Sequence, residues 1–153
     1  MSQIEKVRSF LNNQPKKPQI IEFEQSTHTC ELAAQALSVE IGQIAKSLLL
    51  ITDKGPLMIV TCGDKRINQK KIKETLGLKA RFANSEQVLE FTGYTPGGVC
   101  PFALKTNFPI YLDISMTKYP IVYAAAGTSN TAVPVTFDDL AEITGGTECD
   151  FCD

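Results

Sequence analysis

The sequence contains no tryptophan, one histidine and no long hydrophobic run. Its longest clear apolar run, Leu48 to Ile51, has the length of a strand, whereas a membrane-spanning helix needs about 20 such residues. The N-terminal residues lack the basic-then-apolar pattern of a secretion signal. These absences predict a cytoplasmic protein with no membrane-spanning segment.

Familiar catalytic and metal-binding motifs are also missing. There is no G-x-G-x-x-G after a strand, no P-loop, no H-E-x-x-H and no G-x-S-x-G. The five cysteines are odd in number and scattered, which suits a reducing compartment. Cys149 and Cys152 form a C-x-x-C, but with one histidine and no second pair the zinc ligands are too few. We expect no metal and no cofactor, and we expect the acidic C-terminal residues to fray.

Length and hydrophobic periodicity predict a single domain over residues 1–153. Hairpins mixed with helices indicate an α+β fold with a mixed, mostly antiparallel sheet flanked by helices. Strand 47–52 is expected to be buried on both faces. Ser38 is expected to cap a helical turn that carries Ile41 and Ile44 inward. The predicted helices cover residues 3–12, 30–36, 68–76, 84–91 and a segment after Thr136, and the predicted strands cover residues 19–24, 47–52, 57–62, 80–83, 110–114, 121–125 and 132–135.

Charge is distributed unevenly, although the net charge is only −2. Residues 64–81 hold seven basic side chains against two acidic ones, and residues 82–153 hold two against nine. Such asymmetry predicts a cationic face that attracts a polyanion, with a solvated helix surface as the alternative.

The loop from Thr95 to Leu104 combines two glycines with two prolines. Gly97 and Gly98 carry no Cβ, so another molecule can approach their backbone closely. Pro96 and Pro101 stiffen the loop. The loop suits presentation of backbone N–H and C=O groups to a ligand, and a tight helix-to-strand connection is the plainer interpretation.

Few side chains offer reactive groups. Lys46 has apolar residues on both sides, so it can hold a phosphate or polarise a carbonyl at the mouth of a buried strand, or lie at a strand edge with its ammonium in water. Cys100 is a candidate nucleophile that lacks a local base, because the single histidine, His28, lies at a predicted helix start. The turn Gly127, Thr128 and Ser129 offers small polar groups that can bind a sugar or a phosphate.

Three motifs together, Gly42 to Leu48, Gly97 to Phe102 and Ala126 to Ser129, resemble the YbaK/ProX family of aminoacyl-tRNA deacylases. These proteins are free-standing relatives of the editing domain in bacterial prolyl-tRNA synthetases. The resemblance implies a barrel-like α+β domain that hydrolyses the ester of mischarged tRNA, with tRNA(Pro) carrying cysteine or alanine as the expected substrate. Aminoacyl-tRNA is the implied ligand, and prolyl-tRNA synthetase is a candidate partner.

The resemblance also implies roles for individual residues. Lys46 matches the essential lysine. The substrate pocket is expected to include Gly97, Gly98, Val99, Cys100, Pro101, Gly127, Thr128, Ser129 and His28. The tRNA backbone is expected to meet Lys65, Arg66, Lys70 and Lys71. Two alternatives remain: a non-catalytic tRNA- or synthetase-binding module of the same fold, and a hydrolase of small thioesters that depends on Cys100.

Overall fold

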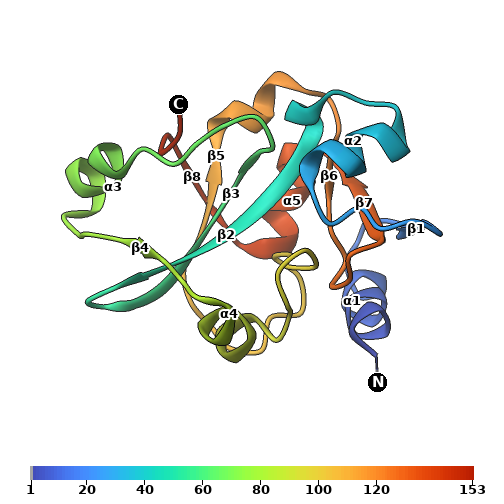
Figure 1. Ribbon diagram of the computed structural model, residues 1–153, viewed down its shortest axis with the longest axis horizontal. Helices are drawn as coiled ribbons and strands as arrows, with labels where there is room; N and C mark the ends of the chain where they lie inside the picture. The colour runs from blue at the N-terminus through green and yellow to red at the C-terminus, as the bar shows by residue number, and fades with distance from the viewer. Residues whose placement is uncertain (1) are drawn as a thin grey trace.

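The computed structural model describes residues 2–153 and contains five α-helices around an eight-stranded sheet (Figure 1). The helices are α1 (Gln3–Asn12), α2 (Cys30–Leu37), α3 (Gln69–Leu76), α4 (Ser85–Thr92) and α5 (Phe137–Thr144), with two 3₁₀ turns, η1 (Ile41–Gln43) and η2 (Ile114–Lys118). The strands are β1 (Ile21–Glu22), β2 (Ile44–Thr52), β3 (Gly55–Cys62), β4 (Arg81–Phe82), β5 (Ile110–Asp113), β6 (Val122–Ala124), β7 (Thr131–Val135) and β8 (Thr147–Cys149). No helix within the described range is long and apolar enough to cross a membrane.

The sheet has the strand order β1-β7-β6-β2-β3-β5-β8, and β4 pairs with β2 beside this path. Antiparallel ladders join β1 to β7, β2 to β3, β2 to β4 and β6 to β7. Parallel ladders join β2 to β6, β3 to β5 and β5 to β8. The predicted α+β class with a mixed sheet is therefore confirmed.

The β2–β3 hairpin separates two hydrophobic cores. Met58 and Val60 of β3 pack into the larger core, which α1 and α5 complete. The alternate residues Leu57 and Ile59 face a smaller core that holds Ile72 of α3. The strand with both faces buried is thus β3, whereas β2 is only half-buried at its centre. The prediction of full burial for residues 47–52 was wrong, because a cavity opens beside them.

Helix ends follow their capping residues closely. Asn84 and Gln87 form a capping box at the start of α4, and Thr136 caps α5. Ser38, by contrast, ends α2 in a left-handed conformation (φ 58°) instead of beginning a second helical turn. Ile44 is buried as predicted, but Ile41 is 37% exposed, so that part of the prediction was wrong.

The C-terminal residues do not fray, contrary to prediction. They form β8 beside β5, and Phe151 is 1% exposed in the smaller core. An apolar anchor within an otherwise acidic segment explains the order, because burying an aromatic ring contributes about 1.5–3 kcal/mol.

Candidate active site

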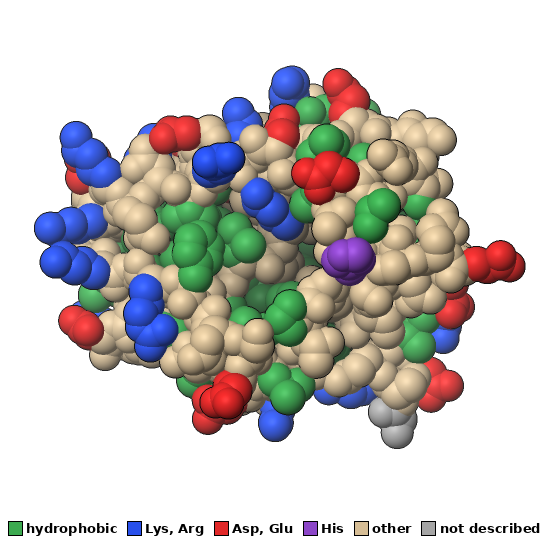
Figure 2. Space-filling view, viewed as in Figure 1, with side chains coloured by type: hydrophobic (Ala, Val, Ile, Leu, Met, Phe, Trp, Pro, Cys, Tyr) green, Lys and Arg blue, Asp and Glu red, His purple; other side chains and the backbone are tan. Residues whose placement is uncertain are grey.

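A cavity of about 360 Å³ opens along β2, between α2 on one side and β4 and α4 on the other. Figure 2 shows it as a hollow near the centre of the molecule, with hydrophobic side chains in and around it and the single histidine at its rim. Its lining comprises Thr27, His28, Thr29, Cys30, Ala33, Leu37, Ile44, Ala45, Lys46, Ser47, Leu48, Leu49, Phe82, Ala83, Val88, Pro96, Gly97, Val99, Tyr123, Ala124, Ala125, Thr131 and Ala132.

The cavity exists because one edge of β2 is left open. β6 pairs with this edge at residues 44–45, and β4 pairs with it at residues 50–51. Between them no strand within residues 2–153 pairs with the edge. The Leu49 carbonyl accepts a hydrogen bond from the Ala83 N–H (3.0 Å), so it points away from β3. Ser47, two residues earlier, presents its backbone N–H and C=O on the same side, towards the cavity.

Ser47 also contributes a side-chain group without a partner. Its Oγ is buried and has no hydrogen-bond partner in the described part of the protein. A buried hydroxyl without a partner costs about 1–3 kcal/mol, so native structures rarely retain one without a reason. Ser47 lines the cavity through its other atoms, so a bound molecule can supply the missing hydrogen bond once the side chain turns towards it.

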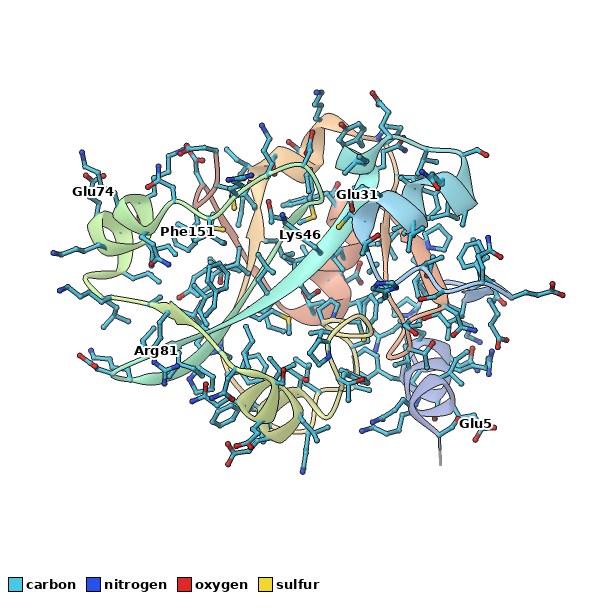
Figure 3. The ribbon with its side chains drawn as sticks, in the orientation of Figure 1. Glu5, Glu31, Lys46, Glu74, Arg81 and Phe151 are labelled. Carbon is cyan, nitrogen blue, oxygen red and sulfur yellow. The ribbon has the colours of Figure 1, made fainter. Side chains whose placement is uncertain are left out.

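The Lys46 side chain is held by the loop that follows β3. Its Nζ donates to the backbone carbonyls of Lys65 (2.5 Å) and Gly63 (3.5 Å). A Cβ on Gly63 would stand 2.6 Å from the Ile41 carbonyl oxygen, so only glycine lets this loop pack so closely. The carbonyls occupy two of the three ammonium N–H donors, which leaves one for a ligand. Figure 3 shows Lys46 on β2, in the middle of the molecule.

The two glycine segments predicted to form the site lie in contact. A Cβ on Gly98 would stand 2.9 Å from the backbone of Gly127 and Thr128. A Cβ on Gly97 would stand 3.1 Å from the Cβ of His28. Gly97 (φ 95°) and Gly127 (φ 89°) also adopt the conformation that glycine favours. The fold thus brings the loop, the turn and His28 together at one end of the cavity.

Not every predicted pocket residue reaches the cavity. His28, Lys46, Gly97 and Val99 line it. Among the described residues, the lining does not include Gly98, Cys100, Pro101, Gly127, Thr128 or Ser129. The turn instead supports the site, since the Ser129 carbonyl accepts from both the N–H (2.6 Å) and the hydroxyl (3.2 Å) of Thr27.

Cys100 points into the larger core and is 0% exposed. Burial raises the pKa of its thiol to about 12, and the thiol donates to the Phe102 carbonyl (3.7 Å). Cys30 does line the cavity, but burial raises its thiol pKa as well, although the Lys46 ammonium partly opposes the rise. Neither thiol is set up as a thiolate nucleophile, which argues against the cysteine-dependent hydrolase.

No carboxylate lines the cavity among residues 2–153. A pair of carboxylates for acid–base catalysis is therefore missing, and no cluster of three potential metal ligands occurs in that range. The cavity instead offers an ammonium, backbone amides and small hydroxyl groups, which suit an anionic or carbonyl-containing ligand.

The predicted basic residues divide into two groups. Lys71 is paired with Asp150 and Asp153 (both 3.2 Å), which raises its pKa. No ion pair involving Lys65, Arg66 or Lys70 occurs in residues 2–153. Basic side chains gather at the end of the molecule formed by α3 and β4 (Figure 2).

Several lining residues escaped prediction, including Ser47, Phe82 and Tyr123. Ser47 follows Lys46 directly and was predicted as part of a strand, with no functional role. Phe82 is 55% exposed at the cavity edge, but it was predicted only as part of a short strand. The signal that the sequence offered was an aromatic residue directly after the basic Arg81 in a short strand. Its exposure, which marks it as a candidate contact residue, is visible only in the structure.

Residues 24–143 match the model of a family described as the aminoacyl-tRNA editing domain. Because this match spans most of the chain, the protein belongs to that family. The resemblance to aminoacyl-tRNA deacylases with a link to prolyl-tRNA synthetase is thereby confirmed.

Relatives include proteins with and without an assigned activity. The chain is 37% identical to a Bacillus subtilis protein named "Uncharacterized protein YwhH" over 140 residues, 91% of this chain and 89% of that protein. It is 28% identical over 120 residues (77% and 73% of the two chains) to an Enterococcus faecalis protein named "Putative Cys-tRNA(Pro)/Cys-tRNA(Cys) deacylase EbsC". A solved structure entitled "Crystal structure of a putative trans-editing enzyme for prolyl tRNA synthetase" superposes with a TM-score of 0.93 at 33% identity, covering 100% of this chain and 98% of the other.

Proposed function

We propose that the protein is a trans-editing aminoacyl-tRNA deacylase that clears small amino acids, cysteine or alanine, from mischarged tRNA(Pro). The observation that carries the proposal is the composition of the cavity: the Lys46 ammonium stands in an otherwise largely apolar lining that holds no carboxylate among the described residues. The relatives' names and the family support the choice of an ester substrate on tRNA.

The proposed chemistry relies on positioning and electrostatics. Lys46 binds the terminal phosphate or the ester carbonyl oxygen through its remaining N–H donor. Water adds to the acyl carbon, and negative charge builds on the carbonyl oxygen. The bond to the ribose oxygen then breaks, and that oxygen takes one of the protons of the attacking water, so the products are the free amino acid and the ribose hydroxyl. Charge stabilisation by Lys46 and by amides of the Gly97 to Val99 loop then lowers the barrier.

Ser47 is proposed as a further substrate-binding residue. Its unpartnered Oγ and its backbone groups on the open edge of β2 lie next to Lys46 in the chain and in the cavity lining. A polar group of the aminoacyl-adenosine end binds the backbone groups directly, and it binds the hydroxyl once the Ser47 side chain turns into the cavity. The alanines at positions 33, 45, 124 and 132 provide apolar surface for a small acyl side chain.

Recognition of the rest of the tRNA is assigned to the basic end of the molecule. Lys65, Arg66 and Lys70 are proposed to contact backbone phosphates, with Lys71 contributing less because it is already paired. Prolyl-tRNA synthetase is proposed as the partner that delivers the mischarged tRNA.

The test is hydrolysis of tRNA(Pro) charged with cysteine, alanine, serine or proline, using the wild type, Lys46→Ala and the matched control Lys54→Ala. Lys54 is an exposed lysine in the β2–β3 turn. We expect one mischarged species to be cleared, with a loss of about 10²–10³ in rate for Lys46→Ala only. If the folded protein cleaves none of these esters, the deacylase assignment fails and the non-catalytic binding module replaces it.

A further inference from the structure

The last residues of the chain bind the loop that holds Lys46. Phe151–Asp153, named here the C-terminal strap, pairs with residues 66–68 in antiparallel fashion. The Arg66 N–H donates to the Asp153 carbonyl (3.1 Å), and the Asp153 N–H donates back to the Arg66 carbonyl (2.9 Å). The Asn68 N–H donates to the Phe151 carbonyl (2.7 Å), and Ile67 bridges Cys152. The strap thus fixes this loop through its backbone.

The strap is itself anchored on the sheet. The Phe151 N–H donates to the buried Asp113 carboxylate (2.9 Å) at the end of β5. The Phe151 ring lies 5.4 Å from the Tyr111 ring, and it packs in the smaller core with Leu50 and Ile72. Lys46 and Leu50 lie four residues apart in β2, so their side chains project from the same face of the hairpin. Phe151 therefore anchors the strap on the face from which Lys46 projects.

Lys46 and the strap meet through the same few residues. The Lys65 carbonyl that accepts from Lys46 Nζ immediately precedes Arg66, which the strap holds on both its N–H and its C=O. Cys152 of the strap feels the same charge: burial raises its thiol pKa to about 11 and Asp113 adds to the rise, while the Thr61 hydroxyl and, to a smaller extent, the Lys46 ammonium lower it. Thr61 is the residue opposite Lys46 in the β2–β3 ladder. Figure 3 labels Phe151 and Lys46 in this region.

We infer that the C-terminal strap is a positioning element for Lys46: it fixes the loop at residues 63–68, whose carbonyls aim the ammonium into the cavity. Without the strap, the loop loses its partner on the side away from β2, and the ammonium loses its fixed acceptors. The structural part of this inference stands on the contacts alone, and its catalytic consequence rests on the proposed deacylase function.

The test variant is Asp153→Pro, which removes the N–H donated to the Arg66 carbonyl. It also removes the carboxylate that pairs with Lys71 and accepts from the Asn68 side chain, and it leaves Phe151 in place. The control is Glu148→Gln, an exposed change of the same charge in β8. We expect kcat for deacylation to fall about tenfold or more in Asp153→Pro, because a group misplaced by about 1 Å can cost 10²-fold. In a Lys46→Ala background, Asp153→Pro should cause no further loss.

Two readouts do not depend on activity. Hydrogen exchange of the Arg66 amide should accelerate at least about tenfold, and the ¹⁵N resonance of Lys46 Nζ should shift, in Asp153→Pro but not in Glu148→Gln. If Asp153→Pro does not fold, Phe151→Leu replaces it, since it keeps an apolar anchor but loses the ring contact with Tyr111.

The outcomes separate the two proposals. A wild type without deacylase activity, combined with a shifted Lys46 resonance, overturns the proposed function and supports the strap. An active enzyme in which Asp153→Pro changes neither the Lys46 resonance nor kcat overturns the strap and leaves the function intact. Equal losses from Asp153→Pro with and without Lys46 also overturn the strap as a positioning element.

Discussion

The backbones of Gly98 and Gly127 lie in direct contact, and no side chain fits between them. A Cβ on Gly98 would stand 2.9 Å from the carbonyl carbon and the oxygen of Gly127. Real Cβ atoms do not approach backbone atoms so closely, so any side chain at position 98 must push the loop and the turn apart. The close packing at this end of the cavity therefore depends on position 98 being glycine, which has no side chain.

Gly98→Ala is expected to reduce deacylation about 10- to 100-fold, because separating the two segments displaces Gly97 and Val99 in the cavity lining. The control is Gly145→Ala, at a position where no atom of residues 2–153 beyond the immediate neighbours lies within 4 Å of the added Cβ, but where φ is positive (68°). It should cost about 1–2 kcal/mol of stability and keep full activity. Thermal melts and deacylation rates measured on both variants check this. Equal activity of the two variants would show that the contact has no catalytic role.

Ser47→Ala is expected to separate stability from function. Removing a buried hydroxyl without a partner should leave the free energy of unfolding unchanged or raise it by about 1 kcal/mol. Deacylation should nevertheless fall about tenfold, since the hydroxyl loses its proposed bond to the substrate. Urea unfolding and kinetics are measured beside Ser85→Ala, an exposed serine in α4. A Ser47→Ala variant that is less stable and fully active would assign the hydroxyl to the fold alone.

Local signals predicted most of the secondary structure. The predicted helix over residues 84–91 and the predicted strands 47–52 and 57–62 were correct in type. The capping box at Asn84, the C-cap at Gly145 and the turn between β2 and β3 depend on residues close in the chain, so local rules detect such features. Lys46 was singled out by its apolar neighbours and the family motif, and the structure has it in the cavity lining.

Features that depend on distant residues were missed. The open edge of β2 arises because β6 and β4 come from separate parts of the chain and stop short of each other. The order of the C-terminal residues depends on Phe151 meeting Tyr111 and Asp113, almost forty residues away. Neither arrangement leaves a local pattern, so periodicity and capping rules do not detect it.

Because of Cys100, the stability of the folded protein is expected to fall with rising pH in the alkaline range. Its thiol pKa is raised by burial from an ordinary value near 9 to about 12, so the folded chain keeps a proton that the unfolded chain releases first. The stabilisation is complete below about pH 9 and is lost as pH rises towards 12. Cys100→Ala should therefore flatten the fall of melting temperature above pH 9 while deacylation at pH 7.5 persists. Loss of hydrolysis with an intact fold would instead revive the cysteine-dependent hydrolase.

Lys70→Ala and Lys71→Ala are expected to affect tRNA binding differently, although the residues are adjacent. Each lysine that neutralises a phosphate contributes about 0.7–0.9 to the slope of log K against log salt concentration. Lys70→Ala should reduce the slope by about this amount. Lys71 already pairs with Asp150 and Asp153, so Lys71→Ala should change the slope less. Binding of uncharged tRNA(Pro) at a series of salt concentrations measures both slopes. An equal reduction of the slope in Lys71→Ala would mean that tRNA displaces the Asp150 and Asp153 side chains from Lys71. The basic surface would then have to rearrange on binding.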